Sequence, residues 1–306
     1  MQALGTEEEI ALAPGTTRAS ELRIANIASQ MRYDIVDMIS KAGSGHPGGS
    51  LSAADIVASL YFSGTMDYDP QNLDDPKRDR FILSKGHAAP VLYAVLAQAG
   101  IIERSELSTL RKLHSRLQGH PDCLKLPGVE VSTGSLGQGL SIASGMALGF
   151  RMTYGGEAPT VFTLIGDGES QEGQVWEAAE FASQYRLGNL VAILDYNTLQ
   201  IDGCVSDIIE VAPAAERWSS FGWKVLEIDG HDIHQICMAL REAKDYSDGP
   251  VMIVAHTVKG KGVSFMEGQA GWHGKAPDEE QTRQALGELS AVIEKTASEM
   301  EAGDVR

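Results

Sequence analysis

Four short apolar runs constrain the fold of this chain more than any other feature of its sequence. They are rich in β-branched or aliphatic residues and show little polar alternation, which is typical of strands that are covered on both faces of a parallel sheet. Helical patterns lie between them, so the chain is predicted to form repeated βαβ units. We therefore expect an α/β fold, a doubly wound and mostly parallel sheet with helices on both faces. The four predicted strands are 160–165, 190–194, 223–228 and 251–255.

The rest of the chain is expected to complete this arrangement. Apolar residues at steps of three and four predict a helix over 24–38 that ends at the glycines after residue 42, and Ser52 is expected to cap a second helix that runs to about residue 62. We divide the chain into an N-terminal extension (1–17), one main domain (18–277) and an acidic C-terminal helix (278–306). The remaining predicted elements are a strand at 80–83 and helices at 88–99, 175–185, 233–243 and 279–301.

The charge balance argues against several classes of function. The 25 basic and 42 acidic residues give a net charge of −17, which repels nucleic acid and anionic membrane surfaces. Glu7, Glu8 and Glu9 stand where a signal peptide needs basic and then apolar residues, and no apolar run reaches the roughly 18 residues of a membrane span. The cysteines lie far apart without a Cys-x-x-Cys pair, which fits a reducing compartment. We expect a cytoplasmic protein that binds neither nucleic acid nor membranes.

Polar residues follow two of the predicted strands directly. Gly166-Asp167-Gly168 comes after the strand at 160–165, and Asn197 comes after the next strand. Ligands of parallel sheets bind beyond the carboxyl ends of the strands, so these side chains are expected at one site. The two glycines allow the backbone to approach a phosphate, and the carboxylate and amide oxygens suit a hard cation that bridges phosphate oxygens.

The segment from Gly166 to Asn197 resembles the magnesium-diphosphate motif of thiamine diphosphate enzymes. The resemblance implies that Mg²⁺ is held by Asp167, by Asn197 and by the main-chain oxygen of Leu199. Diphosphate oxygens and a water would complete the octahedron that magnesium prefers.

Further segments, in order along nearly the whole chain, resemble transketolases in particular. The resemblance implies transfer of a two-carbon ketol unit from a ketose, such as a sugar phosphate, to an aldose, with thiamine diphosphate and Mg²⁺ as cofactors. The segments are Ser44-Gly45-His46-Pro47-Gly48, Ser84-Lys85-Gly86-His87-Ala88, Gly119-His120-Pro121, Ser132-Thr133-Gly134-Ser135-Leu136-Gly137-Gln138-Gly139, Gly166-Asp167-Gly168-Glu169-Ser170-Gln171-Glu172-Gly173 and His273-Gly274.

Histidines in these segments are the candidate catalytic residues, because a hydroxyl must lose a proton as a carbon–carbon bond of the ketose breaks and imidazoles exchange protons near neutral pH. By resemblance, His46 and His273 contact the reacting ketose oxygens and belong to the cofactor site, and His120 binds a donor hydroxyl. His87 is expected to touch the diphosphate together with His273.

Two further segments have roles implied by the resemblance. The main chain of Gly134, Ser135 and Leu136 resembles the loop that holds the aminopyrimidine ring of the cofactor, and Gly168 borders the diphosphate. Glu172 matches an acidic residue in the network between two cofactor sites at the subunit interface. An exposed glutamate favoured at the start of a helix is the alternative for Glu172.

Three residues resemble those of split transketolases and of deoxyxylulose-phosphate synthases. They are Lys85, Lys259 and Ser135, and Ser135 stands where long transketolases have Pro. The chain ends after the diphosphate-binding domain, so the pyrimidine-binding domain, with the glutamate that activates the cofactor, is expected on a C-terminal partner subunit. The expected assembly contains two copies of each subunit.

Two alternatives stay open. One is an enzyme of the same cofactor class that acts on a branched, deoxy or sulfonated sugar or catalyses a reaction of the deoxyxylulose-phosphate synthase type. The other is a cofactor-binding module without catalytic activity.

Overall fold

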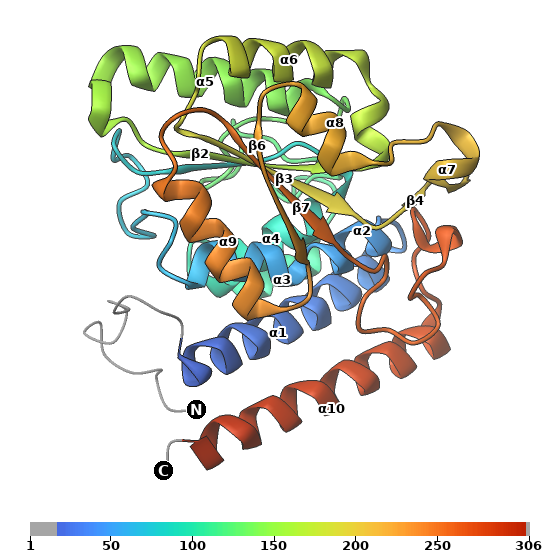
Figure 1. The fold of residues 1–306 in the computed structure, drawn as a ribbon. Helices are drawn as coiled ribbons and strands as arrows, with labels where there is room; N and C mark the ends of the chain where they lie inside the picture. The colour runs from blue at the N-terminus through green and yellow to red at the C-terminus, as the bar shows by residue number, and fades with distance from the viewer. Residues whose placement is uncertain (1–16, 304–306) are drawn as a thin grey trace.

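The computed structural model describes residues 17–303, and its centre is a five-stranded parallel sheet in the order β1-β2-β3-β7-β6 (Figure 1). Residues 160–165, 190–194, 223–228 and 251–255 all lie within or next to strands of this sheet, so the predicted α/β fold is confirmed. A two-stranded antiparallel ribbon, β4-β5, lies beside it. The strands are β1 (Arg80–Leu83), β2 (Val161–Gly166), β3 (Leu190–Tyr196), β4 (Leu199–Gln200), β5 (Gly203–Cys204), β6 (Lys224–Asp229) and β7 (Val251–His256).

Helices cover both faces of the sheet, as the doubly wound prediction requires. In Figure 1, α5, α6 and α8 lie above the sheet, and α1, α3, α4 and α9 lie below it. After β3 the chain passes to the edge strand β6 and then returns to β7, which lies between them. The helices are α1 (Arg18–Ala42), α2 (Pro47–Ser52), α3 (Ala54–Phe62), α4 (Ala89–Gln98), α5 (Gln138–Tyr154), α6 (Gly173–Gln184), α7 (Val205–Ile208), α8 (Ala214–Ser220), α9 (Ile233–Asp245) and α10 (Glu279–Gly303).

Burial differs among the strands of the sheet. β1, β2, β3 and β7 are buried along nearly their whole length, which confirms that they are covered on both faces. The same prediction is wrong for β6, whose residues are half-buried or exposed. β6 lies at one edge of the sheet and pairs only with β7. β1 is buried at the other edge, so the edge position alone does not explain the exposure of β6.

The first two predicted helices are confirmed, but the predicted cap of the second is wrong. α1 begins after a capping box at Thr17 and ends at Gly43, whose φ of 63° is the left-handed conformation that glycine adopts at helix ends. Ser52 does not cap a helix to residue 62, because it is the last residue of α2 and α3 begins at Ala54. Its hydroxyl donates instead to Asp195 at 2.6 Å, a contact between segments 143 residues apart.

The acidic helix α10 lies along α1 in Figure 1, and Asn26 donates to Thr296 at 2.6 Å between them. The division at residues 277 and 278 remains a prediction. The predicted extension, 1–17, lies outside the described residues except for Thr17. Among residues 17–303, no helix combines the length and apolar character that a membrane crossing requires.

Candidate functional site

Strand ends meet at one edge of the sheet. Gly166, the last residue of β2, pairs with Asp195 near the end of β3. Asp167 follows β2, and its carboxylate accepts the backbone N–H groups of Gly168, at 2.7 Å, and of Thr198. The residues after β2 and β3 therefore lie side by side, as the strand-end pattern predicts.

Asp167 is a buried carboxylate, 2% exposed, that accepts hydrogen bonds from two backbone N–H groups. Burial, and then the neighbouring Asp195 carboxylate, raise the pKa of Asp167 to about 6. Burying an anion is costly, and a second carboxylate nearby adds to the cost. A bound cation would lower that cost, which is why this residue fits a metal ligand.

We expect the cofactor-free chain to lose stability relative to its Asp167→Asn variant as the pH rises from about 5 to about 7. The raised pKa means that the folded chain holds this proton more tightly than the unfolded chain, so the carboxylate costs stability once the pH passes the unfolded pKa. The full shift corresponds to about 3 kcal/mol, of which about 1 kcal/mol falls in this range. Urea unfolding at several pH values measures the difference. Asp202→Asn, at an exposed aspartate of the β4-β5 turn, is the matched control, and parallel curves for both variants would contradict the expectation.

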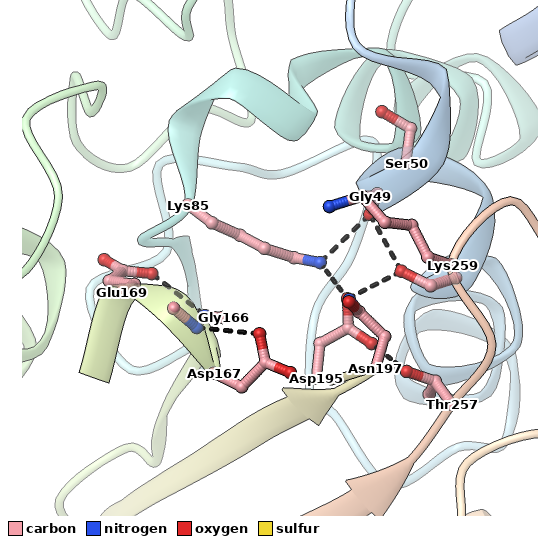
Figure 2. A network of polar contacts seen from close by, with 12 residues as sticks. Gly49, Ser50, Lys85, Gly166, Asp167, Glu169, Asp195, Asn197, Thr257 and Lys259 are labelled. Atoms are coloured by element: carbon pink, nitrogen blue, oxygen red, sulfur yellow. Dashed lines mark hydrogen bonds and ion pairs between the residues drawn. The ribbon is translucent and has the colours of Figure 1, made fainter. Parts of the chain in front are cut away.

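Asp195 organises the polar groups around this edge (Figure 2). It is fully buried and accepts hydrogen bonds from Lys85 and Thr257, and from Ser52 at 2.6 Å. The amide nitrogen of Asn197 also donates to it, at 3.1 Å. This bond identifies which end of the Asn197 amide is the nitrogen. The amide oxygen is therefore the atom that is not bonded to Asp195.

Lys259 joins the strand ends to the histidines. It is 2% exposed, and its ammonium group donates to the carbonyl oxygen of Leu199 and to Nδ1 of His273, both at 2.9 Å. Burial lowers the pKa of Lys259 to about 8. The lysine therefore places a positive charge beside the expected metal ligands.

Three candidate histidines from distant segments form one cluster. The ring centroids of His87 and His273 are 5.0 Å apart and stacked, and those of His46 lie 5.3 and 5.5 Å from them. Burial lowers the pKa of each ring, together with nearby cationic side chains, to about 4 for His46, about 2 for His87 and about 3 for His273. All three are therefore neutral at physiological pH, and each has one nitrogen that donates and one that accepts.

His120 lies at the rim of this cluster. It is exposed and packs on Gly134, where an added Cβ would lie 2.9 Å from the imidazole. Arg111 lies close to His46, with a guanidinium nitrogen 3.4 Å from Nδ1 of that ring, and its charge also lowers the pKa of His120 after burial does. No motif in the sequence pointed to Arg111.

The loop at 134–136 and the candidate Glu172 border the same region. Leu136 is partly exposed and lines the cleft, and Glu172 is the exposed residue before α6, with its Cβ close to Gly137. Glu169, by contrast, is buried and accepts the N–H groups of Gly137 and Gly166 at 2.9 and 3.0 Å. It connects this loop to the end of β2, a role that the sequence patterns do not indicate.

Residues from several of these segments line a cleft of about 190 Å³. Its lining carries both acceptor oxygens for a cation and donors for an anion, which fits a metal-bound diphosphate. In residues 17–303 no three His, Cys, Asp or Glu side chains form a metal site by themselves. Such a site therefore depends on amide, main-chain and ligand oxygens as well. The lining residues are Gly49, Lys85, His87, Leu136, Gly166, Asp167, Gly168, Glu169, Asn197, Leu199, Gln200, Ile201, Lys259 and His273.

Comparison with known proteins identifies relatives of two lengths. The chain is 44% identical over 269 residues to the 6-deoxy-6-sulfo-D-fructose transketolase subunit SqwG of Clostridium sp. (strain MSTE9), covering 88% of this chain and 97% of that protein. It is 42% identical to an apulose-4-phosphate transketolase subunit of Phocaeicola vulgatus, covering 88% and 94%. It is 43% identical to human transketolase, covering 89% of this chain but 42% of that protein.

The fold is shared with solved transketolases. The enzyme from Campylobacter jejuni matches with a TM-score of 0.82 and 32% identity, over 95% of this chain and 47% of that chain. The chain thus spans less than half the length of these longer proteins. Residues 24–294 match the family described as transketolase, thiamine diphosphate binding domain, and the chain belongs to this family.

Proposed function

We propose that this chain is the diphosphate-binding subunit of an enzyme that transfers a two-carbon ketol unit from a ketose to an aldose with thiamine diphosphate and Mg²⁺. The observation that carries the proposal is the strand-end site. There, the buried Asp167, the oriented Asn197 and two neutral rings of the histidine cluster line one cleft in a chain of the transketolase family.

The metal would be held by Asp167, Asn197 and the carbonyl oxygen of Leu199, since Mg²⁺ prefers oxygen ligands. Their arrangement supports this, because the hydrogen bond from Thr198 places the Asp167 carboxylate beside the segment of Asn197 and Leu199. Phosphate oxygens of the cofactor would complete the coordination.

Donors that line the cleft would hold the diphosphate, and other residues of the loops around it the rest of the cofactor. His87 and His273 face this space with Lys85 nearby, and Gly168 lets the backbone come close. The main chain of Gly134, Ser135 and Leu136 would contact the aminopyrimidine ring. When bound, the cofactor supplies the carbon nucleophile and electron sink that ketol transfer requires.

The chain's own contribution to the chemistry would come from its histidines. The neutral rings of His46 and His273 can donate a hydrogen bond to a ketose oxygen or accept a proton from a hydroxyl without a prior change of charge. His120, at the exposed rim, would bind a hydroxyl of the donor sugar.

A partner subunit would cover the cleft. Apolar side chains are exposed around it: Leu136 is 36% exposed and Ile201 is 66% exposed, and both line the cleft. Ile208 and Ile209, 42% and 58% exposed, follow shortly after in the chain. Exposed apolar groups that cluster at one place mark a surface that another chain covers. We propose as the occupant a C-terminal transketolase subunit with the pyrimidine-binding domain.

The assembly would contain two copies of each subunit, with Glu172 near the junction between two cofactor sites. Two relatives of nearly the same length as this chain are named as transketolase subunits, which supports a divided enzyme. The exposed position of Glu172 at the start of α6 leaves its carboxylate available for such a contact.

The donor sugar has two candidate classes. The two relatives are named for 6-deoxy-6-sulfo-D-fructose and for apulose 4-phosphate, so a modified or branched ketose is the second candidate beside ordinary ketose phosphates. A panel of these donors assayed with the assembled enzyme separates the candidates by kcat/KM.

The histidine assignments are tested in the same assay. His46→Ala, His120→Ala and His273→Ala are each expected to lower kcat or donor affinity, with a loss in rate of roughly 10²–10⁴-fold where proton transfer is lost. Their effect on unfolding should be small, because the rings are only half-buried or exposed. His234→Ala, on the exposed side of α9, is the matched control. Rates like the wild type in all three variants would show that these are structural loop residues.

A further inference from the structure

Arg111 holds one side of the His46 ring. One guanidinium nitrogen donates to the hydroxyl of Ser44 at 2.7 Å, and the other terminal nitrogen lies 3.4 Å from Nδ1 of His46. Arginine has only donor groups, so in this contact Nδ1 must be the acceptor. At 3.4 Å the bond is long, and the orientation therefore depends on how firmly the guanidinium itself is held.

The guanidinium is clamped between two loops. Ser44 belongs to the loop of His46, whereas Gly119 directly precedes His120. An added Cβ at Gly119 would lie 3.1 Å from Nε of Arg111, so the guanidinium packs directly on this glycine. The backbone N–H of Arg111 donates to the carbonyl of Leu117 at 2.8 Å, and its φ of 58° is uncommon for a residue with a side chain. These contacts aim the side chain at His46.

The other nitrogen of His46 faces the histidine cluster. Nε2 lies 3.4 Å from the position of an added Cβ at Gly274, next to His273. The ring is neutral at physiological pH, because burial and Arg111 lower its pKa to about 4. A neutral imidazole carries one N–H, and if Nδ1 accepts, that N–H is on Nε2.

We propose that Arg111 is a positioning residue that holds neutral His46 in the tautomer with its proton on Nε2. In catalysis, which rests on the proposed function, His46 would then present a hydrogen-bond donor to the ketose from the side of His273. The same guanidinium would also hold the loops of His46 and His120 in a fixed relative position, because it contacts Ser44 in the first loop and Gly119 in the second.

The tautomer is measured directly by ¹H–¹⁵N NMR of the full chain with ¹⁵N-labelled histidine. The His46 signals, assigned by their loss in His46→Gln, are expected to show a protonated Nε2 in the wild type. His231 is an internal reference of the opposite kind, since its Nδ1 lies 2.7 Å from Asp55 and its Nε2 accepts from Val258 at 2.8 Å.

Arg111→Met is expected to give His46 a mixture of tautomers. Ser44→Ala removes the hydroxyl that anchors the guanidinium, so it is expected to shift the tautomer population in the same direction but by less. Lys112→Met removes a neighbouring exposed charge and should change nothing. In every variant unchanged His231 signals show that the fold is intact. A protonated Nδ1 in the wild type, or the Nε2 tautomer retained in Arg111→Met, would overturn the proposal.

Kinetics of the assembled enzyme separate this proposal from the proposed function. Arg111→Met is expected to lower kcat about tenfold with little change in cofactor affinity, and Arg111→Lys to recover part of the loss. An unchanged kcat in Arg111→Met would overturn the catalytic role. If the assembled wild type transfers no ketol group, the proposed function fails, while the NMR result still decides the tautomer.

Discussion

Asp167→Asn and Asn197→Ala are each expected to lower the magnesium-dependent affinity for thiamine diphosphate by about a hundredfold or more. Loss of an outer partner of a metal ligand alone costs about 10–100-fold in metal affinity. Asp167→Asn removes the negative charge of a ligand, and Asn197→Ala removes the ligand itself. Asp167 is the buried carboxylate at the end of β2, and Asn197 is oriented by its bond to Asp195. Isothermal titration calorimetry of the assembled enzyme, with and without Mg²⁺, measures the effect.

Folding is expected to survive both changes, because neither side chain belongs to the apolar core. Asp202→Asn removes the same charge from an exposed position in the β4-β5 turn and should bind the cofactor like the wild type. Unchanged affinity in both Asp167→Asn and Asn197→Ala would refute the metal assignment.

Ketol transfer is expected to be undetectable with this chain alone and to appear when the partner subunit is added. Under the proposed function, the carboxylate that activates the cofactor belongs to the partner subunit. The exposed apolar side chains at the cleft are also expected to be buried in an interface with another chain. Activity should rise with partner concentration and saturate. Turnover of a ketose phosphate by rigorously partner-free protein would contradict the divided enzyme.

Ile201→Glu tests where the partner binds. This residue lines the cleft and is 66% exposed, so a charge there should weaken pairing and shift the saturation curve to higher partner concentration. Met238→Glu on α9, at a side chain 46% exposed, is the matched control and should leave the curve unchanged. If both variants saturate at the same partner concentration, the partner does not bind at Ile201.

Local sequence patterns predicted most strands and helices, because apolar runs and helical spacing are set by neighbouring residues. The longest element that they missed is α5, since the sequence patterns included no helix over 138–154. Glycines at 139, 145 and 149 weaken its helical pattern. The helix nevertheless forms, with Leu140, Ala143 and Ala147 packed in the core on one face of the sheet.

By itself the sequence determined the parallel sheet and the meeting of Asp167 with the residues after β3. Parallel strands end at the same edge, so residues that follow two neighbouring strands must come together. The tertiary structure alone decided the contacts of Lys85 with Asp195 and of Arg111 with His46, across 110 and 65 residues. A side chain of this length can reach many partners, and no local pattern selects one. Only the packing of the loops against the sheet fixes which of those partners lies within reach, and with it the charge and tautomer of the site.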